Sequence, residues 1–178
     1  LVHGASGGAA LYSTGHHGVY TPAIVLGRGY TGLGALRSLV RAGIPTWIAC
    51  PANDLAARSR WYRGLPGPTP WDGTIDDNAF EQLQALPFEQ AVLIPGADDA
   101  ALWLADVAGS WLSERFRTSS SSRETLEILQ DKDRFALCLA GTGIPHPRTF
   151  AIGDAGDIAA MPIDQLDRLF LKPVESLG

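Results

Sequence analysis

A glycine-rich turn near the start of the chain has the residue spacing of an anion-binding loop. The stretch Gly27-Arg28-Gly29-Tyr30-Thr31-Gly32 follows a short apolar run and opens a segment with helical periodicity. Glycines at this G-x-G-x-x-G spacing let the backbone turn tightly and approach a ligand. The unpaired N–H groups at the start of a helix attract phosphate or carboxylate. The pattern therefore predicts a loop that faces an anionic ligand.

The acidic residue that would mark a dinucleotide site does not follow the second predicted strand. An NAD site needs such a residue about 20 positions beyond the glycines, where it binds the ribose hydroxyls. Cys50 and Pro51 stand there instead, and the nearest acid, Asp54, lies beyond a proline turn. Three interpretations stay open. The residues favour a loop facing an anionic substrate over glycines that only permit close packing of helix and strand, and they favour an NAD site least.

Two lysines interrupt otherwise apolar faces in the second half of the chain. Apolar residues of a helix predicted over 125–139 share one face, and Lys132 falls inside that stripe. In a strand predicted over 169–174, alternation places Phe170 and Lys172 on the same side. Burying an unpaired ammonium is costly, so each lysine either extends to solvent or meets an anion. We expect the two lysines to converge on one cleft that binds phosphate.

Alternating strands and helices must position these residues. Short apolar runs bounded by glycine or proline predict strands, and apolar residues recurring at three and four positions predict helices. The strands are expected at 23–26, 45–50, 90–94, 149–152 and 169–174, and the helices at 33–41, 76–86, 98–116, 125–139 and 157–166. This alternation with short connections predicts an α/β fold with a Rossmann-like parallel sheet covered on both faces.

A polar stretch, Thr118–Ser122, is expected to divide the chain into modules. Residues 1–22 are rich in Gly, Ala and Ser without periodicity, which predicts a flexible N-terminal segment. The Rossmann-like domain would then span 23–118, and a second module would span 124–178.

Composition excludes several classes of protein. The chain has 178 residues, a net charge of −5 and no basic block, which argues against nucleic-acid and membrane-surface partners. A hydrophobic content of 46% with 19% charged residues is typical of a folded globular chain. Cys50 and Cys138 lie far apart in apolar segments, so neither a disulfide framework nor a cysteine-rich metal site is expected. Without a recognisable secretory signal, this cysteine usage predicts a cytoplasmic protein.

The order of several motifs resembles the ATP-grasp superfamily. The segment LQDKDRFALCLAGTGIPHPRTF resembles the opening of that fold, with an Asp-Lys pair in a helix, then Gly-Ile-Pro and Pro-x-Thr. The segment LFLKPVESLG resembles the next strand, which ends in Lys-Pro before a Ser/Gly loop. Upstream, AIVLGRGYTGLGALRSLVRAGIPTWIAC followed by AARSRWYRG resembles the pre-ATP-grasp domain of carboxylate–amine ligases related to carbamoyl-phosphate synthase and D-aspartate ligase. The resemblance covers about residues 23–178.

This resemblance implies roles for individual residues. Lys132 and Lys172 would contact the ATP phosphates. The substrate-binding residues that it implies are Gly27, Arg28, Gly29, Tyr30, Gly32, Arg58 and Ser59, although the last two could instead brace the domain. The second module would be a truncated α+β ATP-grasp module, because the family's C-terminal subdomain with its Mg²⁺ ligands has no counterpart in these residues. Catalytic residues and metal ligands therefore stay unassigned, and we expect the chain alone not to turn over ATP.

The implied function is the N-terminal part of an ATP- and Mg²⁺-dependent ligase. Such an enzyme joins a carboxylate to an amine or similar nucleophile through an acylphosphate, so the expected partners are small-molecule carboxylate and amine substrates. A homodimer is left open. Two alternatives remain: an NAD(P)-dependent Rossmann oxidoreductase that uses the same glycine turn, and a non-catalytic Rossmann-like binding module.

Overall fold

The computed structural model describes residues 20–67, 70–118, 120–162 and 170–173. The chain divides into two compact units, residues 1–122 and residues 123–178. Most of the segment 1–22 lies outside the described residues, which begin at Tyr20. No helix in the described ranges combines the length and the apolar character that crossing a membrane requires.

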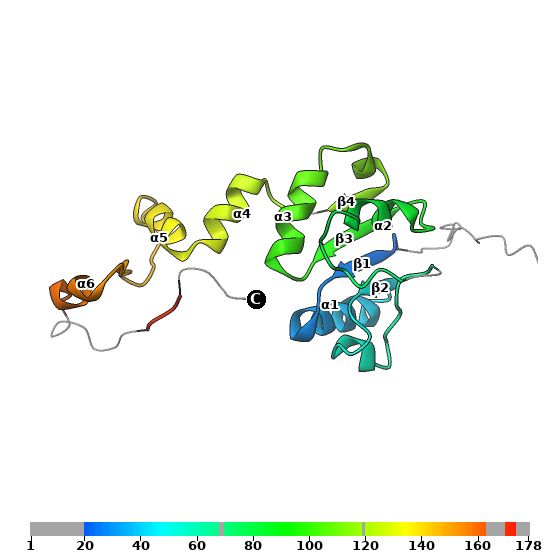
Figure 1. Cartoon of the computed structure of the whole chain (residues 1–178), viewed down its shortest axis with the longest axis horizontal. Helices are drawn as coiled ribbons and strands as arrows, with labels where there is room; N and C mark the ends of the chain where they lie inside the picture. Colours follow the sequence, from blue (N-terminus) through cyan, green and yellow to red (C-terminus); the bar gives the residue numbers. More distant parts are fainter. Residues whose placement is uncertain (1–19, 68–69, 119, 163–169, 174–178) are drawn as a thin grey trace, which may run out of the picture. The chain divides into compact units, whose positions relative to one another are not determined.

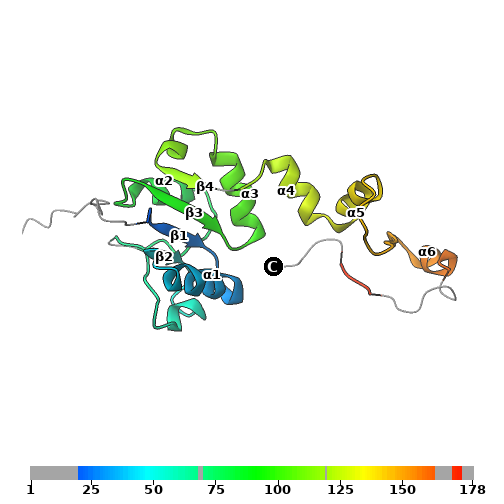
Figure 2. The same ribbon diagram turned by 180° about the vertical axis from the view of Figure 1, so that it is seen from behind.

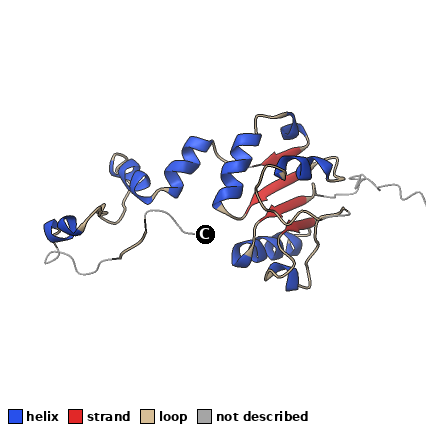
Figure 3. Ribbon diagram, in the orientation of Figure 1, coloured by secondary structure: helices blue, strands red, loops and turns tan. Residues whose placement is uncertain are grey.

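The first unit is built on a four-stranded sheet in which every strand runs parallel to its neighbours (Figures 1 and 3). The strands are β1 (Ala23–Leu26), β2 (Thr46–Ala49), β3 (Ala91–Pro95) and β4 (Phe116–Thr118). Their order is β2-β1-β3-β4, which the view from behind in Figure 2 also shows. All four residues of β1 are buried, as a central strand covered on both faces requires. The predicted α/β class with a parallel sheet is confirmed.

Each face of this sheet has its own apolar core. Helix α1 (Gly29–Arg41) and the 3₁₀ helix η1 (Ala56–Arg58) contribute to the core that contains Val25 of β1. Helices α2 (Ala79–Ala85) and α3 (Asp98–Val107) contribute to the core that contains Ile24 and Leu26. Successive side chains of a strand point to opposite faces, so β1 joins the two cores.

The helix predicted over 98–116 was wrong beyond Val107. The backbone N–H and the hydroxyl of Ser110 both donate to the Val107 carbonyl, at 2.9 and 2.7 Å, and these bonds close the end of α3. A short 3₁₀ helix, η2 (Trp111–Glu114), follows, and Phe116 starts β4 with 3% of its surface exposed. Apolar spacing continues past the true end of the helix, but Phe116 is buried by joining the sheet, which periodicity alone does not reveal.

Arg115 holds the start of β4 against the end of α2. Its Nε donates to the Phe88 carbonyl at 2.5 Å, Nη1 donates to the Gln84 carbonyl at 2.9 Å, and Nη2 donates to the Leu86 carbonyl. The last carbonyl groups of a helix have no N–H partner inside the helix. The forked guanidinium of Arg115 donates to carbonyls at and just beyond the end of α2. Partial burial lowers the pKa of Arg115.

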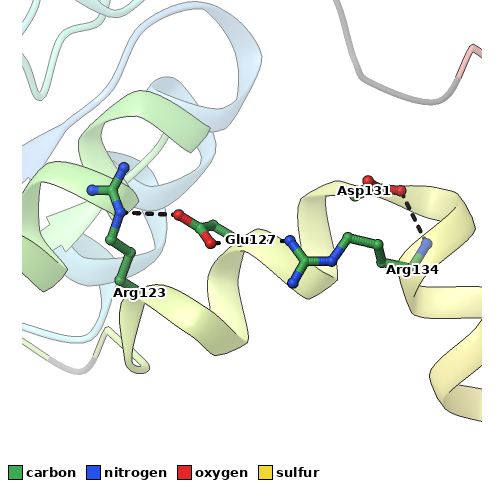
Figure 4. Close-up of polar contacts among 4 residues, drawn as sticks. All are labelled: Arg123, Glu127, Asp131 and Arg134. Carbon is green, nitrogen blue, oxygen red and sulfur yellow. Dashed lines mark hydrogen bonds and ion pairs between the residues drawn. The ribbon is translucent and has the colours of Figure 1, made fainter.

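The helix predicted over 125–139 is two helices in the structure, α4 (Arg123–Gln130) and α5 (Lys132–Ala140). Asp131 separates them because its carboxylate accepts the backbone N–H groups of Asp133 and Arg134, both at 3.0 Å, and so caps α5. Figure 4 shows the bond of this cap between Asp131 and Arg134. It also shows Glu127, which pairs with Arg123 at 3.0 Å and lies 4.0 Å from Arg134. These exposed ion pairs contribute little stability. We therefore attribute the break between α4 and α5 to the Asp131 cap.

The remaining predictions for the second unit are corrected as well. The strand expected over 149–152 is irregular, and so are residues 170–173 of the strand expected over 169–174. The helix expected over 157–166 is α6 (Ala155–Ala160), whereas 163–166 lies outside the described residues. A β-strand needs a neighbouring strand for its ladder of hydrogen bonds, and the described part of this unit forms no sheet.

The helices of the second unit contain no buried residue among those described. Large apolar side chains are instead exposed here, including Leu137 (76%), Phe170 (88%) and Leu171 (80%). Both apolar cores found among the described residues belong to the first unit.

We therefore predict a sharp difference in amide hydrogen exchange between the units. Helices without buried side chains open at a low free-energy cost, so amides of 123–162 should exchange much faster than those of β1, β2 and β3. Exchange followed by mass spectrometry at peptide resolution measures this directly. Equal protection of the two regions would contradict the account of the second unit.

Candidate functional site

The candidate site lies at the carboxyl edge of the sheet, where the chain leaves β1 and β3. A Cβ atom on Gly27 would lie 2.8 Å from the Cα atom of Gly96, so neither position accepts a side chain without a shift of the backbone. The Gly96 N–H donates to the Leu26 carbonyl at 2.7 Å. The two loops therefore touch at the backbone, and this close approach defines the edge. Ligands of open parallel sheets bind at such edges.

Asp54 is bound to the glycine turn. The N–H of Gly29, a residue with φ +61°, donates to Asp54 Oδ2 at 2.8 Å, and the N–H of Ala56 donates to Asp54 Oδ1 at 2.8 Å. The carboxylate thus takes up a donor at the start of α1, where a bound anion would otherwise be attracted. An anion that approaches Gly29 has to displace Asp54 or bind beside it against charge repulsion.

Two glycines of the turn have packing roles. A Cβ on Gly32 would lie 2.7 Å from the Gly27 carbonyl oxygen, so α1 can start this close to β1 only with glycine there. This geometry supports the close-packing interpretation for Gly27 and Gly32. Arg28 and Tyr30 have exposed side chains at the same turn, with Tyr30 84% exposed, so both are accessible to a ligand.

Charged groups of both signs surround the edge. The backbone N–H of Thr74 donates to Asp72 at 2.9 Å, and this bond, with a smaller contribution from Arg28, lowers the pKa of Asp72. Burial raises the pKa of the Cys50 thiol to about 11, and the charges of Asp54 and Asp72 add to the rise. Cys50 therefore stays protonated and is a poor nucleophile. The edge therefore presents the guanidinium of Arg28 together with the carboxylates of Asp54 and Asp72.

Arg58 and Ser59 line a different hollow from the glycine turn. Their pocket, of about 490 Å³, is also lined by Arg37, Arg41, Arg60 and Trp61 and includes no residue of the turn. Of this group, only Arg58 and Ser59 were predicted as site residues from the sequence. A signal was available, because residues 28–63 contain six arginines and a single acidic residue.

The two lysines lie on separate segments of the second unit. Lys132 is the first residue of α5 and is half-buried, so the break at Asp131 removes it from the continuous stripe expected over 125–139. Lys172 is exposed, and its Nζ lies 5.9 Å from the centre of the Phe170 ring. Their convergence on one cleft stays a prediction.

Neither a cluster of metal-binding residues nor a similarity to a known protein indicates what this site binds. The described residues contain no group of three or more His, Cys, Asp or Glu side chains that could hold a metal ion. A comparison of the chain with protein-family models gave no match, and a comparison with curated proteins gave none either.

Asp54 should contribute measurably to stability, because its removal leaves two backbone donors without their acceptor. We expect Asp54→Ala to lower the free energy of unfolding by about 1.5–3 kcal/mol. Asp54→Asn, which keeps one side-chain carbonyl oxygen, should cost roughly half as much. Urea denaturation measures both changes. The matched control is Asp77→Ala at an exposed position, with an expected cost below about 0.5 kcal/mol. If Asp54→Ala were as mild as this control, the carboxylate would not hold the edge.

Proposed function

We propose that the chain is the N-terminal part of an ATP-dependent ligase that joins a carboxylate to an amine or a similar nucleophile. The observation that carries the proposal is the order of its parts. A parallel α/β unit with a glycine turn precedes a unit in which Asp131-Lys132 starts a helix, followed by Gly-Ile-Pro and Pro-x-Thr. We further propose that the first unit is a Rossmann-like pre-ATP-grasp domain and the second the beginning of an ATP-grasp domain.

Asp54 supports this proposal over an NAD-dependent oxidoreductase. A dinucleotide pyrophosphate would use the N–H groups at the start of α1, and Asp54 already accepts from Gly29 there. Two negatively charged groups competing for the same donors repel each other, so the observed arrangement disfavours pyrophosphate. The acidic residue in the loop after β2, Asp54, therefore binds the glycine turn. In a dinucleotide site, the acidic residue after this strand binds the ribose hydroxyls instead.

In the proposed reaction, an oxygen of the substrate carboxylate attacks the γ-phosphorus of ATP. The bond between that phosphorus and the bridging oxygen breaks, and ADP leaves with the electron pair. The amine nitrogen then attacks the carbonyl carbon of the acylphosphate, phosphate leaves, and the nitrogen loses a proton. The protein supplies positioning and charge neutralisation.

The proposal gives the chain's residues distinct parts in this reaction. Lys132 and Lys172 would neutralise the phosphate oxygens of ATP. The glycine turn would face the carboxylate or acceptor without using the Gly29 N–H that Asp54 occupies. The exposed Arg28 would attract the carboxylate, and Tyr30 is accessible beside it. Mg²⁺ belongs to the proposal through the family resemblance alone, and no residue described here is assigned to it or to a step that it would assist.

We predict that Lys172→Ala weakens the binding of Mg·ATP at least tenfold in the protein as its gene encodes it. Each charge-assisted contact to phosphate is worth about 1.5–3 kcal/mol, and a factor of ten corresponds to about 1.4 kcal/mol. Competition with a fluorescent ATP analogue measures the affinity. Arg148→Ala is the matched control, because Arg148 is also an exposed cation over a ring, 4.7 Å from the centre of Phe150. If wild type and Lys172→Ala bind Mg·ATP with equal affinity, the proposed ATP-grasp assignment is wrong.

A second prediction separates the ligase from the oxidoreductase. Neither NAD nor NADP should bind in the micromolar range, because the glycine turn is occupied by Asp54 and no acid takes the ribose position. Isothermal titration calorimetry with each dinucleotide measures this. Tight NAD binding that Gly29→Val abolishes would instead favour the oxidoreductase.

A further inference from the structure

Positive charge is concentrated in one part of an otherwise acidic protein. Residues 28–63 contain six arginines, no lysine and one acidic residue, a net charge of +5 in a chain whose total is −5. The one acidic residue, Asp54, is already bound to two backbone N–H groups. The rest of the chain therefore carries −10, and the arginine-rich stretch stands out against it.

The fold gathers five of these arginines around two hollows. The first hollow, of about 490 Å³, is lined by Arg37 and Arg41 from α1 and by Arg58 and Arg60 from the segment after it. The second, of about 400 Å³, is lined by Arg60 and Arg63, and Arg60 and Trp61 belong to both. Arg37 and Arg41 are four residues apart on a helix, so they lie on the same face. These volumes are typical of pockets for small molecules.

The backbone that carries this cluster is held in place. The Ile48 N–H of β2 donates to the Arg63 carbonyl at 3.0 Å, and the Tyr62 N–H donates to the Ser59 carbonyl at 2.9 Å. The guanidinium carbon of Arg60 lies 4.4 Å from the centre of the Trp61 ring, and that of Arg37 lies 5.9 Å from it. Stacking on an aromatic ring positions a guanidinium while leaving its N–H groups available.

None of the five guanidinium groups forms an ion pair or a hydrogen bond with the described part of the chain. All five side chains are exposed, so water satisfies their donors in the free protein. Like charges gathered at one place repel each other, and this repulsion falls when an anion binds. The helix dipole stabilises the positive charge of Arg41 in the last turn of α1. Arg58 and Arg60 are not part of that helix, so this interaction does not explain why they lie at the same hollow.

We propose that these hollows form a binding site for a small ligand that carries phosphate groups. Guanidinium forks match phosphate oxygens in a bidentate geometry, and several forks around one hollow suit a ligand with two or more negative charges. The other residues of the first unit carry −7, which disfavours a long polyanion or an anionic membrane and favours a compact ligand. This site is separate from the glycine turn and does not rest on the proposed ligase activity.

Inorganic pyrophosphate at low ionic strength is the probe, with affinity measured by calorimetry and location by amide chemical shifts. We expect binding that weakens as salt is added, with shifts in 37–41 and 58–63. Arg60→Gln and Arg37→Gln should each weaken binding at least tenfold, which corresponds to one lost charge-assisted contact. Arg117→Gln, at an exposed arginine of β4, is the control and should stay within about twofold. Circular dichroism checks that the variants fold.

Three outcomes would overturn the proposal. The first is the absence of pyrophosphate binding at low ionic strength. The second is binding that shifts only the amides of 27–32, which would place the anion at the glycine turn. The third is binding of poly-glutamate or of a single-stranded oligonucleotide at 37–41 and 58–63 much more tightly than pyrophosphate, which would point to a macromolecular partner. Because Lys172 is not varied here, loss of this site and loss of the ligase assignment are distinguishable.

Discussion

The carboxylate of Asp54 is the contact on which the arrangement of the first unit depends. It joins the start of α1 to the loop after β2, and through Ala56 it also fixes the start of η1. The chain then continues into Arg58–Trp61, which lines the arginine pocket together with α1. A single acidic side chain thus joins the glycine turn to the segment that leads into the basic surface. Its negative charge also disfavours the nucleotide phosphates that such a turn would otherwise attract.

The two units differ in what stabilises them. In the first, a central strand is buried from both sides, and Arg115 supplies donors to the end of α2. In the second, local interactions predominate, such as the Asp131 cap of α5 and the pairing of Glu127 with its neighbours. A unit that holds its helices mainly by caps and exposed ion pairs gains little from burial. Its described helices accordingly have no buried residue.

Prediction from the sequence succeeded where the apolar residues are either continuous or repeat at a regular spacing. The continuous apolar run at 23–26 and the periodic helix that follows it are both in the structure. It failed where a tertiary contact outweighs the periodicity. Phe116 joins the sheet although its spacing continues a helix, and Asp131 ends a helix whose apolar stripe runs on. The contact between Asp54 and Gly29 spans 25 residues, and the arginines of the pocket come from two elements, so no local pattern could pair them.

Amide resonances of the glycine turn, followed while Mg·ATP and then NAD are added to the full chain, test the central claim most directly. That claim is that Asp54 occupies the turn and excludes nucleotide phosphate from it. We expect the Gly29 amide to keep its position with either nucleotide, because its hydrogen bond to Asp54 is retained. A saturable shift of the Gly29 amide with either nucleotide in the wild-type chain would show that phosphate reaches the turn although Asp54 is bound there.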